Sequence, residues 1–238
     1  MKKIEKLLVI SPFVILIFLM TGCTPQYIPN TLNVPMLKNK GEFQASVNTG
    51  GFIFFDPQFA YALTDNVGLM LNTSFQNTKG KMGDYHKHIL GEAGIGYFNN
   101  IGKYFNFEVY TGYGYNKIKT QKTIYLGGYE TYYSNTNTDR IFLQPNIGFS
   151  YGILEYNLSG RLTYNFIHDL YNEKELQALF LDPAVTLKLG KNPFKVSLQG
   201  GFSLPLYQSD IIEYQLFIVA IGLHYNISKK ASTQVKSF

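Results

Sequence analysis

Apolar and polar side chains alternate along residues 154–166, whose sequence is LEYNLSGRLTYNF. One side takes leucine, tyrosine, phenylalanine and a glycine, and the other takes glutamate, asparagine, serine, threonine and Arg161. Successive side chains of a β-strand point to opposite faces, so this pattern predicts a strand with one apolar and one polar face. It exceeds the usual strand of about five or six residues and is long enough for the roughly 9–11 tilted residues that cross a bilayer.

The same alternation recurs along the chain and predicts about ten strands in all. The least regular is residues 88–98, where Leu90 falls on the same side as Glu92 and Gly94. The other predicted strands are residues 42–50, 55–63, 67–75, 104–116, 140–151, 179–189, 194–204 and 214–227.

Short and long connections alternate between these strands. Residues 64–66, 99–103, 152–153 and 190–192 are tight turns, whereas residues 77–87, 120–139, 167–177 and 205–213 are longer. Outer-membrane barrels have short periplasmic turns, longer extracellular loops and an even strand number. The pattern predicts an all-β, antiparallel, up-and-down transmembrane barrel of about ten strands, with both ends at the short-turn side. Residues 51–54 are short and apolar, and if they are no loop the alternative is eight strands.

The position of the aromatic residues bears on which face points outward. On the apolar face, tyrosine and phenylalanine gather near both ends of the predicted strands, as in the aromatic girdles of a lipid-exposed band. The polar face is rich in Asn, Gln, Ser and Gly, which suits a narrow hydrated interior. A soluble lipocalin-like barrel with its apolar face inside has the same period and remains the alternative.

Composition and the N-terminus favour export to a membrane. Charged residues make up 16% of the chain, against roughly a quarter in soluble globular domains. Residues 1–22 have a basic start followed by an apolar run that is too short for a comfortable transmembrane helix, so they are expected to be a helical signal peptide. Without residues 1–22, which hold three Lys and one Glu, the net charge falls from +5 to +3. This mild charge and the lack of a basic stripe argue against nucleic acid as a partner.

The only cysteine, Cys23, directly follows this apolar run. The sequence Leu19-Met20-Thr21-Gly22-Cys23 resembles a bacterial lipobox, although Met20 departs from the usual Leu, so Cys23 is expected to be lipidated. Residues 23–40 contain three prolines and no periodicity and are expected to form a periplasmic linker. The barrel is expected over residues 41–228, followed by a polar tail at 229–238.

The opening of the mature chain also resembles a family. The motifs are Tyr27-Ile28-Pro29-Asn30, Asn33-Val34-Pro35 and Lys40-Gly41-Glu42. Together with the lipobox-like cysteine they resemble the start of small, porin-like outer-membrane β-barrel proteins common in Bacteroidota. The resemblance implies a barrel fold and says nothing about an activity.

Five charged residues fall on the polar face of the predicted strands: Glu92, Glu108, Arg161, Lys188 and Lys195. Unpaired charges are costly to bury. The hypothesis is that Glu92 and Glu108 pair with Arg161 and partly plug the interior, while Lys188 faces Lys195 across a tight hairpin. The alternative is that each charge is separately solvated.

Candidates for chemistry are few. Asp84, His86 and His88 lie near one long connection and His168 and Asp169 near another, but no third metal ligand is evident beside the two histidines of residues 84–88. No enzyme activity, metal or cofactor is expected. The tyrosine-rich stretch 125–133 could stack on a sugar or a protein through Tyr125, Tyr129, Tyr132 and Tyr133.

The sequence therefore predicts a non-enzymatic outer-membrane β-barrel with a structural or interaction role through its exposed loops. A narrow porin passing small polar solutes and a soluble lipocalin-like binding barrel are the alternatives. The expected location is the outer membrane of a Gram-negative bacterium with both termini periplasmic. The expected partners are outer-membrane lipid and, through the loops, a cell-surface glycan or protein.

Overall fold

The computed structural model describes residues 25–50, 54–80, 83–125, 128–207 and 212–227. None of these residues forms a helix long and apolar enough to span a membrane. The strands are β1 (Phe43–Thr49), β2 (Asp56–Ala62), β3 (Val67–Lys79), β4 (Tyr85–Ile101), β5 (Phe105–Tyr125), β6 (Tyr129–Tyr151), β7 (Leu154–Asp169), β8 (Lys174–Lys191), β9 (Phe194–Phe202), β10 (Leu204–Tyr207) and β11 (Phe217–Ile227). The expected signal peptide, Cys23 and the C-terminal tail lie outside the described residues.

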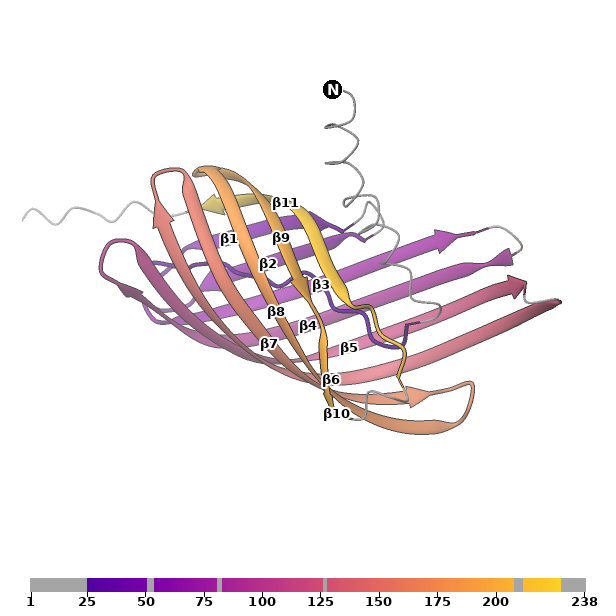
Figure 1. Cartoon of the computed structure of the whole chain (residues 1–238). Coiled ribbons are helices and arrows are strands. Elements are labelled where there is room, and N and C mark those ends of the chain that lie inside the picture. The colour runs from indigo at the N-terminus through magenta and orange to yellow at the C-terminus, as the bar shows by residue number, and fades with distance from the viewer. Residues whose placement is uncertain (1–24, 51–53, 81–82, 126–127, 208–211, 228–238) are drawn as a thin grey trace, which may run out of the picture.

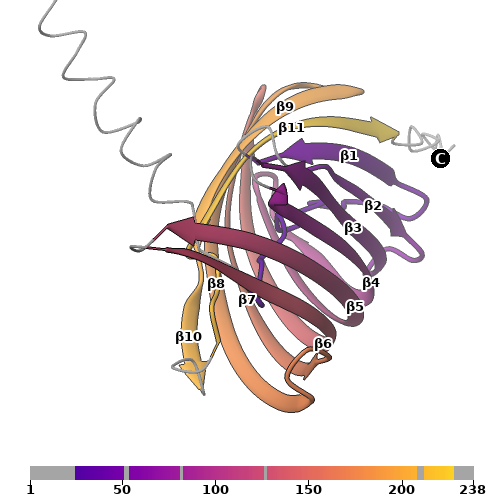
Figure 2. The same ribbon diagram turned by 90° about the vertical axis from the view of Figure 1, so that its right-hand side faces the viewer.

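The strands close into an antiparallel barrel (Figures 1 and 2). β1 to β9 pair in chain order, β9 pairs with β11, and β11 pairs with β1 to complete the ring. The short strand β10 follows β9 and pairs with the part of β8 that β9 leaves free. The predicted ten-strand barrel is confirmed, with β10 as an extra strand, and the eight-strand alternative is wrong.

The two ends of the barrel differ in their connections. At one end, here called the short-turn end, β1 begins, β11 ends, and tight turns join β2 to β3, β4 to β5, β6 to β7 and β8 to β9. The opposite end, here called the long-loop end, carries the connections between β3 and β4, β5 and β6, and β7 and β8.

Three of the expected long loops are mostly strand, and β3 and β4 pair as far as Lys79 opposite Tyr85. β5 and β6 stay paired as far as Tyr125 opposite Tyr129, so the loop expected over residues 120–139 is wrong. β7 and β8 likewise pair as far as Asp169 opposite Lys174. Threonines and tyrosines in these segments favour strand structure, and cross-strand pairs stabilise a hairpin past the barrel wall. The paired hairpins project from the long-loop end (Figure 1).

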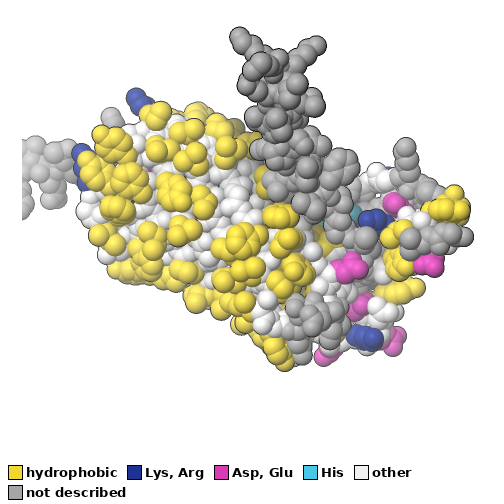
Figure 3. Space-filling model, in the orientation of Figure 1, with side chains coloured by type: hydrophobic (Ala, Val, Ile, Leu, Met, Phe, Trp, Pro, Cys, Tyr) yellow, Lys and Arg dark blue, Asp and Glu magenta, His cyan; other side chains and the backbone are white. Residues whose placement is uncertain are grey.

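The apolar face points outward, as predicted. Large apolar side chains such as Leu71, Ile95, Ile147 and Leu198 are about half exposed on the outside. Figure 3 shows hydrophobic side chains spread over the outer face of the strands and charged ones gathered near the long-loop end. Aromatic rings touch one another near both ends of this surface, in pairs such as Phe105–Phe149, Phe194–Tyr225 and Tyr164–Phe166.

The N-terminal segment runs through the inside of the barrel. Residues 27–37 are all buried, and Figures 1 and 2 show their indigo trace within the ring of strands. The expectation of a linker outside the barrel is therefore wrong for these residues. The proline-rich segment forms no strand ladder of its own. Polar side chains of the lumen can bond instead to its backbone N–H and C=O groups.

Two glycines of the wall make room for this segment. A Cβ atom on Gly148 would lie 2.3 Å from Met36 Cε, and one on Gly68 would lie 2.9 Å from Leu37 Cδ1. A side chain at either position would therefore force Met36 or Leu37 of the segment to shift. Leu37 also packs in a buried cluster with Ala60, Ala62 and Phe98. The two alanines leave room for its side chain beside the wall.

Candidate functional site

The threaded segment enters the lumen from the long-loop end. The backbone N–H groups of Gln26 and Tyr27 donate to the carbonyl of Glu213, at 2.7 and 3.2 Å. The Tyr27 ring stacks on Phe180 with centroids 3.9 Å apart, and its hydroxyl donates to Asp182 at 2.6 Å. This end of the segment is fixed by backbone, ring and side-chain contacts together.

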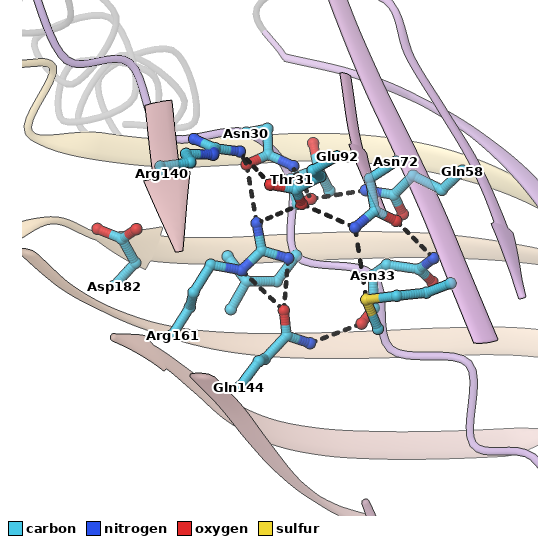
Figure 4. Close-up of polar contacts among 12 residues, drawn as sticks. Asn30, Thr31, Asn33, Gln58, Asn72, Glu92, Arg140, Gln144, Arg161 and Asp182 are labelled. Atoms are coloured by element: carbon cyan, nitrogen blue, oxygen red, sulfur yellow. Dashed lines mark hydrogen bonds and ion pairs between the residues drawn. The ribbon is translucent and has the colours of Figure 1, made fainter. Parts of the chain in front are cut away.

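An ion cluster holds the middle of the segment (Figure 4). Glu92 on β4 forms ion pairs with Arg140 on β6 and with Arg161 on β7, the latter at 2.8 Å, and all three side chains are almost fully buried. The side-chain oxygen of Asn30 accepts from both arginines, at 2.8 and 2.9 Å. Asn30 thus joins the segment to both arginines of the cluster.

Amides continue this network away from the ions (Figure 4). Arg161 Nε donates to Gln144 at 2.8 Å, and Gln144 donates to the backbone carbonyl of Asn33 at 2.7 Å. Asn72 donates to Glu92 at 2.7 Å and accepts from the Asn33 side chain at 2.7 Å. The segment is thus bonded to the wall through its backbone and its side chains.

The charges of the cluster balance. Asp182 lies opposite Arg161 in the pairing of β7 with β8, so two carboxylates stand beside the two arginines. Buried charges are tolerated when they are paired and hydrogen-bonded. Glu92 is paired with both arginines, and Asp182 accepts from the Tyr27 hydroxyl, so the segment is tied to these charges through Asn30 and Tyr27.

Nearer the short-turn end, the segment meets two more of the expected charged residues, Glu108 and Lys188. Glu108 accepts from the backbone N–H of Leu37 at 2.9 Å and from Asn146 at 3.2 Å. Lys188 donates to the carbonyl of Val34 at 2.5 Å. Lys195 pairs instead with Glu155, on the wall, at 2.5 Å.

The structure brings together some members of the expected charge network and not others. Glu92 pairs with Arg161, but Glu108 binds the threaded segment and Asn146 rather than Arg161. Lys188 lies opposite Ser197, and Lys195 lies opposite Gly190, so the two lysines do not face each other directly. The partners of Glu108 and Lys188 include backbone groups of a segment that the pattern gave no reason to place inside.

Sequence reasoning missed Arg140 as a member of the cluster. The alternation placed Arg140 on the polar face of its strand. Its register partner in β5 is Gly114, and Glu92 is the partner of the same glycine in β4. Counting residues from the tight turns across three neighbouring strands would have brought Glu92 and Arg140 to one depth.

The tyrosines expected to bind a partner lie on the projecting hairpin of β5 and β6. Tyr125 and Tyr129 meet edge to face with centroids 5.3 Å apart and are about two-thirds exposed. Tyr133 stacks on Tyr171 at 5.8 Å, and Tyr132 donates to Glu130 at 2.7 Å. The structure brings these rings to one end of the barrel and leaves their faces partly accessible.

The histidines and aspartates singled out from the sequence fall into two groups, one at the start of β4 and one at the end of β7. His88 is buried in the lumen, whereas His168 is partly exposed, 3.5 Å from Asp139 and 3.6 Å from Glu175. Asp169 caps the turn after β7 by accepting from the backbone N–H groups of Tyr171 and Asn172. Within the described residues there is no group of three metal-ligating side chains.

No protein-family model matches the chain, and no curated protein is significantly similar to it.

Proposed function

We propose that this protein is an outer-membrane β-barrel whose lumen is closed by its own N-terminal segment. Its long-loop end has a structural or interaction role. The observation that carries the proposal is the complete burial of residues 27–37 inside a barrel with an apolar outer face. The role is non-enzymatic: the ion cluster of Glu92, Arg140 and Arg161 serves to hold the segment.

The outer surface supports the membrane part of this proposal. A lipid-facing barrel carries an apolar band with aromatic girdles outside and polar residues inside. A lipocalin-like barrel carries an apolar cavity instead. Here aromatic pairs lie near both ends of the outer face, and the lumen holds ions and amides.

The lengths of the longest strands support the exposure of the long-loop end. β5 and β6 have 21 and 23 residues, and a tilted strand crosses a bilayer in about 9–11 residues. The remainder, including the tyrosines, would stand beyond the membrane on the surface, where a glycan or protein partner could reach it.

Planar-bilayer recording with the mature chain refolded in detergent tests the proposal. We expect the native chain to enter the bilayer without opening steady channels, because the segment fills the lumen. A variant lacking residues 25–37 should conduct, and the exposed substitution Lys117→Ala should behave like the native chain.

The other outcomes are informative. Steady channels in the native chain would overturn the closed-barrel proposal and favour a narrow porin. If neither the native chain nor the deletion variant associates with lipid, the membrane proposal fails and the soluble barrel replaces it.

A further inference from the structure

The outer face of β5 changes from apolar to basic on the way to the long-loop end. The outward side chains of residues 105–115 are aliphatic or aromatic apart from Thr111, and the last of them is Tyr115. This run matches the roughly 9–11 tilted residues that cross a bilayer. The next two outward side chains are Lys117 and Lys119, so the lysines begin where the apolar band ends.

The neighbouring strand β4 adds a third lysine at the same level. Lys87 lies directly opposite Lys119, and the next outward residue of β4, Ile89, lies opposite Lys117. All three lysines are exposed, and together they are here called the lysine patch. Like charges directly opposite each other in a sheet are destabilising, so the lysine patch costs stability unless an anion lies beside it.

Within the described parts of the chain, no carboxylate forms an ion pair with the lysine patch. Asp139 on β6 lies diagonal to Lys117, but it accepts from the Tyr113 hydroxyl and lies 3.5 Å from His168 Nε2. The residues directly opposite the patch on β3 and β6 are neutral asparagines, namely Asn77, Asn135 and Asn137. Three positive charges therefore face outward with no acidic partner among the described residues.

The position of the lysine patch indicates which kind of anion reaches it. The patch lies on the side of the wall, immediately beyond the apolar band, and not at the tip of the hairpin formed by β5 and β6. For a barrel in a membrane, this level is the layer of lipid headgroups. Anionic headgroups attract clusters of lysine and arginine near a membrane surface, and lysine binds phosphate as a point charge.

We propose that the lysine patch binds the phosphate group of an anionic lipid in the leaflet at the long-loop end. The phosphate lies beside Lys87 and Lys119, and the acyl chains lie against Ile89 and Tyr115 of the apolar band. The bound phosphate offsets the repulsion between the lysines. This inference rests on the proposed membrane location, and it adds a partner for the outer wall that the closed lumen does not require.

Native mass spectrometry of the mature chain in detergent micelles tests the lysine patch. The probes are phosphatidylglycerol and lipid A, which carry net negative charge, and phosphatidylcholine, in which a quaternary amine balances the phosphate. We expect both anionic lipids to bind more tightly than phosphatidylcholine. Lys87→Gln and Lys119→Gln should each weaken binding of the anionic lipids about fivefold, the usual contribution of one basic residue near an anionic surface. Neither should change the affinity for phosphatidylcholine.

Three controls separate lipid binding from folding and from unspecific charge effects. Lys174→Gln changes an exposed lysine of β8 at the same end of the barrel, and it should leave every lipid affinity unchanged. Lys87→Arg keeps the charge and should bind anionic lipid like the native chain. In lipid-free detergent, no patch variant should unfold at a lower temperature than the native chain, because the replaced side chains form no ion pair within the described residues.

Three results would overturn the proposal. The first is equal affinity of the native chain for all three lipids. The second is an undiminished preference for anionic lipid in the triple variant Lys87→Gln, Lys117→Gln and Lys119→Gln. The third is tighter binding of soluble polyglutamate or inorganic phosphate than of either anionic lipid, which would indicate a partner outside the membrane.

The outcomes also distinguish this proposal from the membrane location on which it rests. A chain that binds phosphatidylcholine as tightly as the anionic lipids contradicts the lysine-patch proposal alone. A chain that binds no lipid at all contradicts both, and bilayer recording then shows independently whether it enters a membrane.

Discussion

Glu92 and Arg161 meet across the lumen, with Oε1 and Nη1 2.8 Å apart, although 69 positions separate them in the chain. Their strands, β4 and β7, are not neighbours in the sheet. The bridge therefore crosses the interior, and Asn30 of the threaded segment bonds to the same arginine. One ion pair thus joins two walls of the barrel and the segment between them.

Replacing Arg161 by Ala should destabilise the barrel by about 3–5 kcal/mol, the usual cost of removing one partner from a buried ion pair. Glu92 would keep Arg140, but Gln144 and Asn30 would lose a donor. The free energy of unfolding in urea, measured in detergent micelles, reports the effect. Lys117→Ala, at an exposed position, should change it by less than about 0.5 kcal/mol.

The coupling between the two residues is a separate prediction. In a double-mutant cycle with Glu92→Gln and Arg161→Gln, the two effects should be non-additive by about 0.5–3 kcal/mol, because both act on one ion pair. The same urea unfolding measures all four proteins. Additivity within about 0.3–0.5 kcal/mol would show that the charges act independently.

Tyr27→Phe removes only the hydroxyl that donates to Asp182. The ring can still stack on Phe180, so the expected loss is that of leaving a buried acceptor with one donor fewer, about 1–3 kcal/mol. Thermal or urea unfolding measures it. Tyr97→Phe on the outer surface is the matched control and should have almost no effect.

The two ends of the threaded segment should be accessible from opposite sides of a membrane. Pro25 directly precedes Gln26, which bonds to Glu213 near the long-loop end, whereas Lys40 donates its backbone N–H to Asp65 in the turn between β2 and β3. In a Cys23→Ser background, we expect an impermeant maleimide added to intact cells to label Pro25→Cys and not Lys40→Cys. The reverse pattern would contradict the orientation with the long-loop end outside.

Stability should fall as pH rises through the titration of Glu42, which lies just before β1. Burial raises the pKa of its carboxyl group, and hydrogen bonds from the backbone of Lys38 and Asn39 oppose that shift. The folded state therefore favours the protonated form, so this contribution is present below the ordinary pKa of 4.5 and is lost as pH passes the raised value. Urea unfolding between about pH 4 and pH 8 measures it, and Glu42→Gln should remove that part of the pH dependence.

Part of the charge cluster could be predicted from the sequence. The alternation put Glu92, Glu108, Arg161, Lys188 and Lys195 on the inward face, and the structure places all five inside. Their partners could not be predicted in full, because Glu108 and Lys188 bond to backbone groups of the threaded segment. A polar face shows that charges point inward, but not what fills the space between them.

The placement of the N-terminal segment corrects the predicted topology. Both ends of the mature chain were expected at the short-turn end, but Gln26 and Tyr27 bond near the long-loop end while β11 ends at the short-turn end. The expectation is wrong for the part of the N-terminus that the structure describes. The pattern of three prolines and no periodicity does not distinguish an external linker from a segment that fills the lumen.

A period of two residues and the turn residues between the runs were enough to predict most strands of the barrel and the direction of their faces. They left eight or ten strands open and ended β5 too early, because the tally of strands and the length of a hairpin depend on pairing. That residues 27–37 lie inside is known from the folded barrel alone. Their partners are remote, as in the bond from Leu32 to Gln199 across 167 positions. Such bonds exist only once the ring has closed, when its width and the depth of each inward side chain are fixed, and no local pattern encodes either.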